Sequence, residues 1–214
     1  FFPQILSGPI GRAGAMLPQI AQMPRPTAEQ LQQGVLLMMR GFAKKLLLAD
    51  VLGQYLVDPA IEDTAALSAP LLLLGLYGFT LQLYFDLSGY TDLARGAGKL
   101  LGIELMRNFN RPYHAASVSE FWQRWHISMS SFFRDYLYFA VGGSKHGNVY
   151  LNLLITFVAI GLWHGAGWNF VVYGALHGSL VAWVRFWRPR KGRSFNGVSN
   201  RLLGTALTFH FVVF

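Results

Sequence analysis

The chain has 214 residues, of which 53% are hydrophobic, 15% aromatic and only 13% charged. A soluble domain usually carries about 25% charged residues, so the composition argues against an ordinary soluble domain and predicts a surface that faces lipid. The net charge of +8 does not indicate a nucleic-acid partner, because the cations gather at the ends of apolar runs, as in loops facing the cytoplasm and anionic headgroups.

The N-terminal part is predicted to hold one long helix. Residues 1–26 are rich in proline and glycine, which predicts an irregular or interfacial segment. Thr27 and Gln30 match a capping box, and the helix that they open is expected to run to about Leu56. Residues 58–64 are polar and are expected to form a short loop.

The clearest membrane span follows this loop. Residues 68–85 contain no charge and approach the roughly 20 residues that a spanning helix needs. Residues 86–114 are too polar and glycine-rich to cross lipid alone, so at membrane depth protein or a water-filled cavity must surround them. Within this stretch Thr91 or Asp92 is expected to cap a separate helix over residues 93–104.

A second amphipathic helix is predicted after Ser117 or Ser119, either of which suits its N-cap. One face repeats at steps of three and four residues and is mostly aromatic: Phe121, Trp122, Trp125, Met129, Phe132 and Tyr136. Another face is polar: Gln123, His126, Ser130 and Arg134. Two interpretations stay open, a helix at the headgroup interface with tryptophan anchors and a helix whose polar face, with His126, lines a water-filled groove.

The last third of the chain is predicted to contain three apolar helices. Residues 149–163 and 170–187 are apolar and are hinged at "WHGAGWN". A cationic loop follows, and a final apolar helix runs from residue 202 to the end. The clustered cations of the whole chain are Arg40, Lys44, Lys45, Arg185, Arg188, Arg190, Lys191 and Arg193. The layout lacks an initiator methionine and a signal peptide, so we expect an internal piece of a longer protein.

His164 is the first candidate for chemistry. An ionisable residue within a membrane segment is costly and by default functional, although such histidines also serve as hydrogen-bonding links between helices. Gly165 and Gly167 favour the functional interpretation, because they let the backbone bend and another group come close.

The other polar candidates have simpler explanations beside functional ones. Asp86 suits a charge at a helix end. Asn108 and Asn110 suit either a turn before Pro112 or donors to a ligand oxygen. His177 shares a helix face with aromatic residues and is expected to serve packing.

The sequence lacks the motifs of several common catalytic and metal sites. The absence of cysteine excludes disulfides and thiolate sites. We find no H-E-x-x-H, no histidine pair four residues apart, no G-x-S-x-G and no glycine-rich phosphate loop. A two-histidine metal site across helices is the one metal alternative, and we assign no metal ligand.

Five stretches together resemble the membrane-bound O-acyltransferase family, most closely its alginate O-acetyltransferase-like bacterial branch. They lie in the family's order and cover nearly the whole chain: "FFPQILSGPIGR" (1–12), "LYFDLSGYTDLARGAGKLLGIEL" (83–105), "NFNRPY" (108–113), "SEFWQRWHISMSSFFRDYLYFAVGG" (119–143) and "GLWHGAGWNFVVYGALHG" (161–178). The "LYFAVGGSKHG" stretch departs modestly from the branch's proline-containing, more basic version.

The resemblance implies an all-α fold, a polytopic membrane helical bundle surrounding a transmembrane tunnel, with amphipathic or interfacial helices. Residues 1–214 would form a single domain, an internal fragment lacking N- and C-terminal helices. An acyl thioester, acetyl-CoA or an acyl carrier, would be offered from the cytoplasmic side of the bacterial inner membrane as co-substrate, with no bound cofactor. The implied partners are membrane lipid, a polysaccharide acceptor and periplasmic or extracellular acetyltransferase proteins, and no nucleic acid.

The resemblance also implies residue roles. His164 in "LWHG" matches the signature histidine and would act as general base, and His126 in "RWHIS" matches the second catalytic position. The residues expected to bind or support substrate are Asp86, Asp92, Asn108, Trp122 and Trp163. We expect Trp163 and Trp168, the two tryptophans that flank His164, to shape a water-poor lining around it. The alternatives are D-alanyl transfer toward teichoic acid, a transporter or channel component with a histidine-lined proton path, and a structural scaffold.

Overall fold

A computed structural model describes residues 1–5, 8–22, 24–62, 67–187 and 198–213. These residues are helical with no strand among them, which confirms the all-α fold class, while the polytopic bundle and its tunnel stay predictions. Contacts group the chain into a first unit, residues 1–108 with 213–214, and a second unit, residues 109–212. Each unit is described by itself, and the expected single domain stays a prediction.

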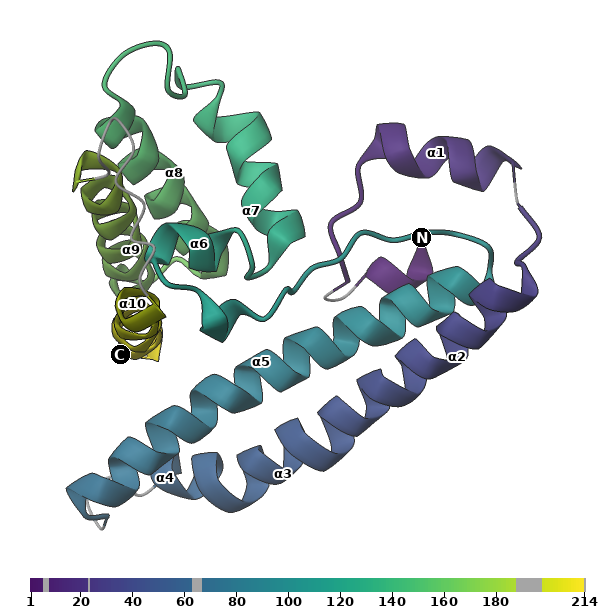
Figure 1. The fold of residues 1–214 in the computed structure, drawn as a ribbon, viewed down its shortest axis with the longest axis horizontal. Helices are drawn as coiled ribbons and strands as arrows, with labels where there is room; N and C mark the ends of the chain where they lie inside the picture. The colour runs from purple at the N-terminus through teal and green to yellow at the C-terminus, as the bar shows by residue number, and fades with distance from the viewer. Residues whose placement is uncertain (6–7, 23, 63–66, 188–197, 214) are drawn as a thin grey trace. The chain divides into compact units, whose positions relative to one another are not determined.

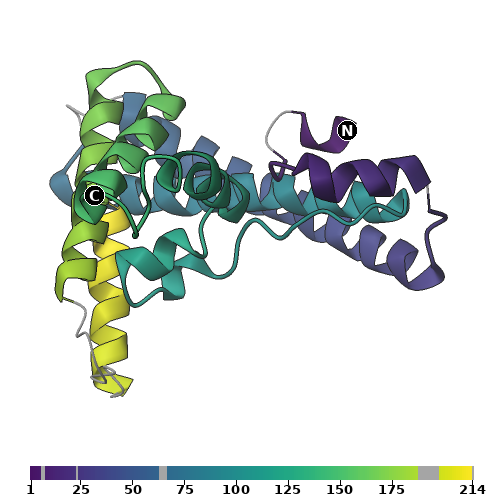
Figure 2. The same cartoon turned by 90° about the horizontal axis from the view of Figure 1, so that it is seen from above.

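The N-terminal segment of the first unit is more ordered than its composition indicates. A short 3-10 turn, η1 (Phe2–Gln4), precedes helix α1 (Ala13–Gln22), so the expectation of an irregular segment is wrong for residues 13–22. Helix α1 lies beside the C-terminal part of the longest helix of this unit (Figure 2). The buried side chain of Met16 packs there in a cluster with Ala94, Ile103 and Leu105, and this burial stabilises the helix despite its internal proline.

The capping box of the next helix is confirmed. Thr27 Oγ1 accepts a hydrogen bond from the Gln30 N–H (3.1 Å), and Gln30 Oε1 accepts one from the Thr27 N–H (2.9 Å). Helix α2 (Ala28–Phe42) then continues without a loop. The continuation consists of two π-helical stretches and two short α-helices: η2 (Ala43–Ala49), α3 (Asp50–Leu52), η3 (Gly53–Val57) and α4 (Asp58–Glu62).

The predicted helix end near Leu56 and the polar loop at 58–64 are therefore wrong for residues 58–62. Packing explains the difference. A Cβ at Gly75 would lie 2.5 Å from Ala60 Cβ, so α4 packs directly against the following helix.

Helix α5 (Ala69–Leu100) is continuous over 32 residues. The expected break after residue 85, with Thr91 or Asp92 capping a new helix, is wrong. Among the described residues α5 alone has the length and composition to cross a membrane. It ends in a Schellman motif: the Ile103 N–H donates to Gly98 O (2.8 Å), and Gly102 takes a left-handed φ of 74° with Pro24 O close against it.

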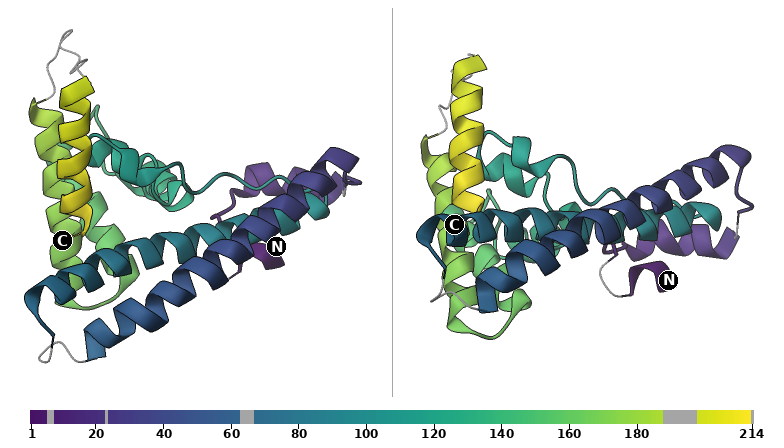
Figure 3. Two further views of the ribbon diagram at one scale, coloured as in Figure 1. Left: turned by 60° about the horizontal axis from the view of Figure 1, so that its bottom comes forward. Right: turned by 90° about the horizontal axis from the view of Figure 1, so that it is seen from below.

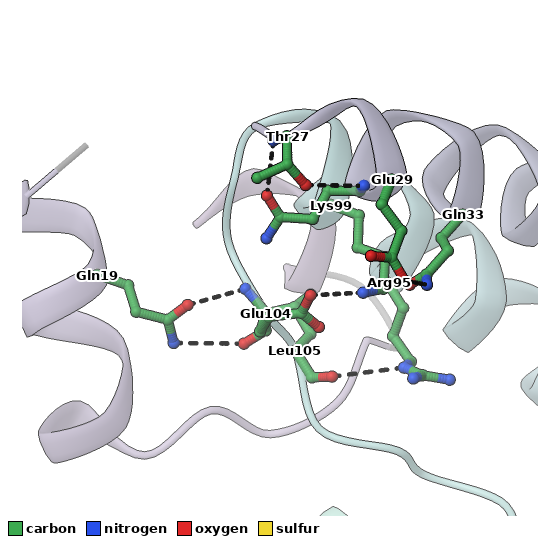
Figure 4. A network of polar contacts seen from close by, with 9 residues as sticks. Gln19, Thr27, Glu29, Gln33, Arg95, Lys99, Glu104 and Leu105 are labelled. Carbon is green, nitrogen blue, oxygen red and sulfur yellow. Dashed lines mark hydrogen bonds and ion pairs between the residues drawn. The ribbon is translucent and has the colours of Figure 1, made fainter. Parts of the chain in front are cut away.

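The chain after α5 is pinned by polar contacts to the helices around it (Figure 4). Gln19 pairs with the backbone of Glu104, accepting from its N–H (2.8 Å) and donating to its oxygen (3.3 Å). Lys99 forms an ion pair with the Glu104 carboxylate, and Arg95 Nε donates to Leu105 O.

Helices α2 and α5 run antiparallel and side by side (Figure 1), and glycines set their spacing. A Cβ at Gly34 would lie 3.0 Å from Gly96 O, and one at Gly41 would lie 2.8 Å from Gly89 O. Two glycines seven residues apart on α2 therefore face two seven residues apart on α5, and the two backbones touch.

A buried carboxylate lies between these two glycine contacts. Asp92 accepts from Arg40 Nε (2.8 Å) and Nη2 (2.7 Å) and from Lys44 Nζ (2.7 Å). Its side chain is only 6% exposed. Pairing with two cations is what allows a charge to stay ionised at such a position, and it replaces the predicted capping role.

The second unit begins with a broken amphipathic segment. After η4 (Pro112–His114), Ser117 caps helix α6 (Val118–Trp122) by accepting from the Glu120 N–H (3.2 Å). A turn precedes α7 (Ile127–Phe133) and its π-helical extension η5 (Arg134–Tyr138). The prediction of one continuous helix is wrong, because the Arg124 carbonyl accepts a hydrogen bond from the Asn110 N–H (2.9 Å) instead of continuing the helix.

Three apolar helices complete this unit: α8 (Val149–His164), α9 (Trp168–Trp187) and α10 (Val198–Val213). Asn148 caps α8, accepting from the Tyr150 N–H (2.9 Å). The predicted hinge is confirmed, and α10 runs beside α9 (Figure 3). The expected cations Arg188, Arg190, Lys191 and Arg193 lie outside the described residues.

Glycines also set the spacing of α8 and α9. A Cβ at Gly174 would lie 2.4 Å from Phe157 O, and one at Gly161 would lie 2.1 Å from Phe170 O. The two helices therefore meet backbone to backbone on both sides of the hinge.

Gly41→Ala tests the contact between α2 and α5. The added methyl meets backbone atoms at 2.8 and 2.9 Å, so we expect a loss of about 1–3 kcal/mol in unfolding free energy, measured by thermal unfolding in detergent. Gly14→Ala is the control, because nothing lies within 4 Å of its added Cβ. Equal stability of the two variants would contradict the close packing.

Asp92→Asn tests the ion triad. Removing the charge leaves Arg40 and Lys44 without their anion, so we expect a loss of at least about 2 kcal/mol by the same measurement. Asp86→Asn on the same helix is the control. Asp86 pairs with Lys45 with both side chains over 40% exposed, so its loss should stay within about 1 kcal/mol.

Candidate active site

His126 occupies the turn between α6 and α7 in an unusual backbone state. Its φ is 42° and its ψ is 55°, a left-handed conformation that is uncommon and strained for a residue with a side chain. Its Nδ1 atom is buried and has no hydrogen-bond partner among the described residues. Burial lowers the pKa of His126 to about 4, with repulsion from His164 in the same direction, so the ring is neutral at pH 7.

His164 ends helix α8, and the ring of Trp163 contacts both His164 and His126. The centroid of Trp163 lies 4.9 Å from that of His164 and 6.2 Å from that of His126. The structure therefore brings together the two predicted catalytic histidines and Trp163.

The start of α9 supplies the other neighbours of His164. The rings of Phe170 and Tyr173 lie 6.4 and 5.9 Å from the imidazole. A Cβ at Gly165 would lie 2.3 Å from Phe170 Cε2. The prediction that glycine admits a close neighbour is thus confirmed, and the neighbour is Phe170.

The expected water-poor lining is not formed by the described residues. Trp163 is 52% exposed and Trp168 83% exposed, and His164 is exposed as well. The described residues alone therefore do not enclose His164, and the water-poor lining stays a prediction.

Trp122 and His177 form a buried pair behind the histidines. Trp122 Nε1–H donates to His177 Nδ1 (3.3 Å), and each side chain is 6% exposed. Sequence reasoning assigned His177 to packing and missed this hydrogen bond. One feature of the sequence could have indicated it. Trp122 lies on the aromatic face of its predicted helix, and a buried indole N–H needs a hydrogen-bond acceptor.

A cavity of about 1250 Å³ lies within the second unit, among α6, α7, η5, α8 and α9. Its wall is mixed, with polar side chains from α6 to η5 and apolar ones from α8 and α9. Its lining includes Trp122, Ile127, Arg134, Leu153, Phe157, Ile160, Val181 and Arg185. His126 and His164 are not among the lining residues, although Ile127 directly follows His126 and Ile160 lies one turn before His164.

The remaining predicted site residues belong to the first unit. Asp92 is engaged by Arg40 and Lys44, Asp86 pairs with Lys45, and the buried Asn108 donates to Thr91 Oγ1 (3.4 Å). Their substrate-binding roles stay predictions. Over the ranges that the structure describes, no group of three or more histidine and acidic side chains is placed to hold a metal ion.

Comparison with known proteins identifies the family. A model of the membrane-bound O-acyltransferase family matches residues 1–202. The chain is 41% identical over 186 residues to the probable alginate O-acetylase AlgI of Azotobacter vinelandii, which covers 85% of this chain and 36% of the relative. It is 36% identical over 216 residues to the peptidoglycan O-acetyltransferase of Helicobacter pylori, which covers 99% of this chain and 41% of the relative.

A third relative carries a different acyl group in its name. The teichoic acid D-alanyltransferase of Bacillus subtilis is 32% identical over 230 residues, covering 100% of this chain and 58% of the relative. The chain spans less than half the length of the two O-acetyl relatives. With the family model matched over nearly its whole length, the chain belongs to the membrane-bound O-acyltransferase family.

Proposed function

We propose that this chain carries the catalytic histidines of a membrane O-acyltransferase. The reaction would move an acetyl group from a cytoplasmic thioester to a hydroxyl of an exported, alginate-like polysaccharide or of a relay protein. The observation that supports it best is the placement of His126 and His164 on one tryptophan ring in a chain of this family.

The chemistry follows from the weakness of the nucleophile. A neutral imidazole at His164 removes the hydroxyl proton as the new C–O bond forms, an effect worth about 10²–10⁴-fold in rate. The tetrahedral intermediate then expels the thiolate, and the C–S bond breaks while the proton passes from His164 to the leaving sulfur. His126, Asn108 or a backbone N–H near Gly165 is proposed to stabilise the oxyanion.

The cavity of the second unit is the proposed entrance for the thioester arm. Leu153, Phe157 and Val181 give it an apolar wall, which suits an acyl chain. Arg134 and Arg185 add cations, which suit the phosphates of acetyl-CoA or of an acyl carrier's prosthetic arm. The partners proposed for the whole protein are membrane lipid, the polysaccharide and extracytoplasmic acetyltransferases, at the bacterial inner membrane.

D-alanyl transfer toward teichoic acid is the second candidate, because the Bacillus relative matches the whole chain. The O-acetyl relatives are more similar in sequence, which favours acetyl. A histidine-lined proton path predicts ion flux without acyl transfer.

His164→Ala in the full-length protein should remove acyl transfer from a labelled thioester, because the imidazole that accepts the hydroxyl proton is gone. Expression and thermal unfolding should stay normal. We expect His126→Gln to lower kcat with little change in the donor KM. His146→Ala, on an exposed turn, is the control and should keep wild-type rates. Undiminished transfer by His164→Ala refutes the assignment.

The stability of the protein should fall in mild acid because of His126. Its pKa in the fold is about 4 and its ordinary value is 6.5, so the unfolded state binds more protons between these values and stability rises with pH across them. The contribution is complete above pH 6.5 and is lost as pH falls toward 4. Thermal unfolding of wild type and His126→Gln should show a flatter pH dependence for the variant; parallel curves would contradict the neutral buried ring.

A further inference from the structure

We propose that His177 is a positioning residue that holds the two catalytic histidines in place, through Trp122 on one side and Tyr173 on the other. This inference rests on the proposed function. His177 lies on α9, outside the pair of histidines placed at the reaction, and nothing in the reaction scheme uses it.

The contact with Trp122 fixes the chemical state of His177. An indole nitrogen can only donate a hydrogen bond, so His177 Nδ1 must present a lone pair to Trp122 Nε1–H at 3.3 Å. A protonated His177 would place two N–H groups against each other. The ring is therefore held neutral, with its proton on Nε2, and its orientation is set by a directional bond.

On one side this fixed ring packs toward His164. The centroid of His177 lies 4.5 Å from that of Tyr173, one turn earlier on α9, and Tyr173 stands perpendicular to His164 at 5.9 Å. Phe211 of α10 closes the other side of His177 at 5.1 Å. Because His164 is the last residue of α8, ring contacts of this kind limit where its imidazole points.

On the other side the same bond fixes the end of α6, four residues before His126. Trp122 is the last residue of α6, and the left-handed turn at His126 follows four residues later. Trp122 also packs edge-on against Phe157 of α8 at 5.3 Å. The Trp122–His177 bond thus ties α6, which leads into the turn at His126, to α9, whose Phe170 and Tyr173 contact His164.

A histidine that only fills space differs from a positioning residue in what can replace it. Phenylalanine keeps most of the ring volume but removes the acceptor, leaving a buried indole N–H unpaired. Asparagine loses ring packing but offers an oxygen near the position of Nδ1. Replacing both partners by phenylalanine removes the bond without leaving an unpaired donor.

The experiment uses the full-length protein in detergent, with radiolabelled acetyl-CoA as donor and alginate oligosaccharides as acceptor. We expect His177→Phe and Trp122→Phe each to lower kcat by about 10–100-fold, the size of effect that follows from misplaced catalytic groups. The donor KM of His177→Phe should change less than about threefold, because His177 does not line the cavity proposed for the thioester. The double variant should be no slower than the slower single variant, because both remove the same bond. His177→Asn should recover part of the lost rate.

A second readout does not depend on turnover. Ring-¹⁵N histidine spectra, with His164 and His126 assigned from His164→Ala and His126→Gln, should show both resonances moved or broadened in His177→Phe and Trp122→Phe. His146→Phe, a matched change on an exposed turn, should leave both resonances and kcat unchanged. Thermal unfolding confirms that each variant is folded.

The outcomes separate the two hypotheses. If His164→Ala abolishes transfer while His177→Phe and Trp122→Phe keep wild-type kcat and unmoved His164 and His126 resonances, the inference is wrong and the proposed function stands. If His164→Ala keeps full transfer, the proposed function falls. If the wild-type protein shows no acyl transfer in this assay, the histidine spectra alone test the inference. Unmoved His164 and His126 resonances in His177→Phe and Trp122→Phe then overturn it.

Discussion

Contact between helix backbones at glycine is the constraint on which both units depend. The α8–α9 pair can close to this distance only because Gly161 and Gly174 have no side chains, since a Cβ at either would lie within 2.4 Å of a carbonyl oxygen of the facing helix. With the helices held this closely on both sides of the hinge, the last residue of α8 must lie beside the first turns of α9. The neighbours of His164, Phe170 and Tyr173, follow from that spacing, so the site is a direct consequence of the helix packing.

The same constraint explains how the first unit holds a charge in its longest helix. Glycines at positions 89 and 96 of α5 bring the backbone of α2 close on both sides of Asp92. Arg40 on α2 and Lys44 on η2 can then reach the carboxylate, and both oxygens of Asp92 are engaged. An aspartate in an apolar helix is costly when it is alone. The two cations and the glycine contacts are therefore parts of one arrangement. Substituting a cation or a glycine would leave the Asp92 carboxylate without its partners in an apolar environment.

Local signals in the sequence were sufficient where the structure depends on neighbouring residues. The capping box at Thr27 and the hinge after His164 are of this kind, and both are confirmed. The failures depend on distant partners. Residues 86–92 resemble a break in sequence because Arg40 and Lys44, which pair with Asp92, lie 52 and 48 positions away. The three- and four-residue spacing of aromatic residues after Ser117 does not show that the Asn110 N–H will donate to the Arg124 carbonyl. The histidines at 126 and 164 were found from their types and motifs, but the partner of His177 is 55 positions away.

His126 and His177 differ in a way that fits two separate roles. His177 is in an ordinary helix with Nδ1 satisfied by Trp122, whereas His126 has a left-handed backbone and a buried Nδ1 without a described partner. A strained backbone and an unpaired polar atom each cost about 1–3 kcal/mol, and such features persist only where the surroundings hold them in place. The satisfied histidine anchors the end of α6, from which the chain enters the strained turn. A ring whose nitrogen is left unpaired by the protein keeps its hydrogen-bonding capacity for a substrate, which is what a reaction with an uncharged hydroxyl requires.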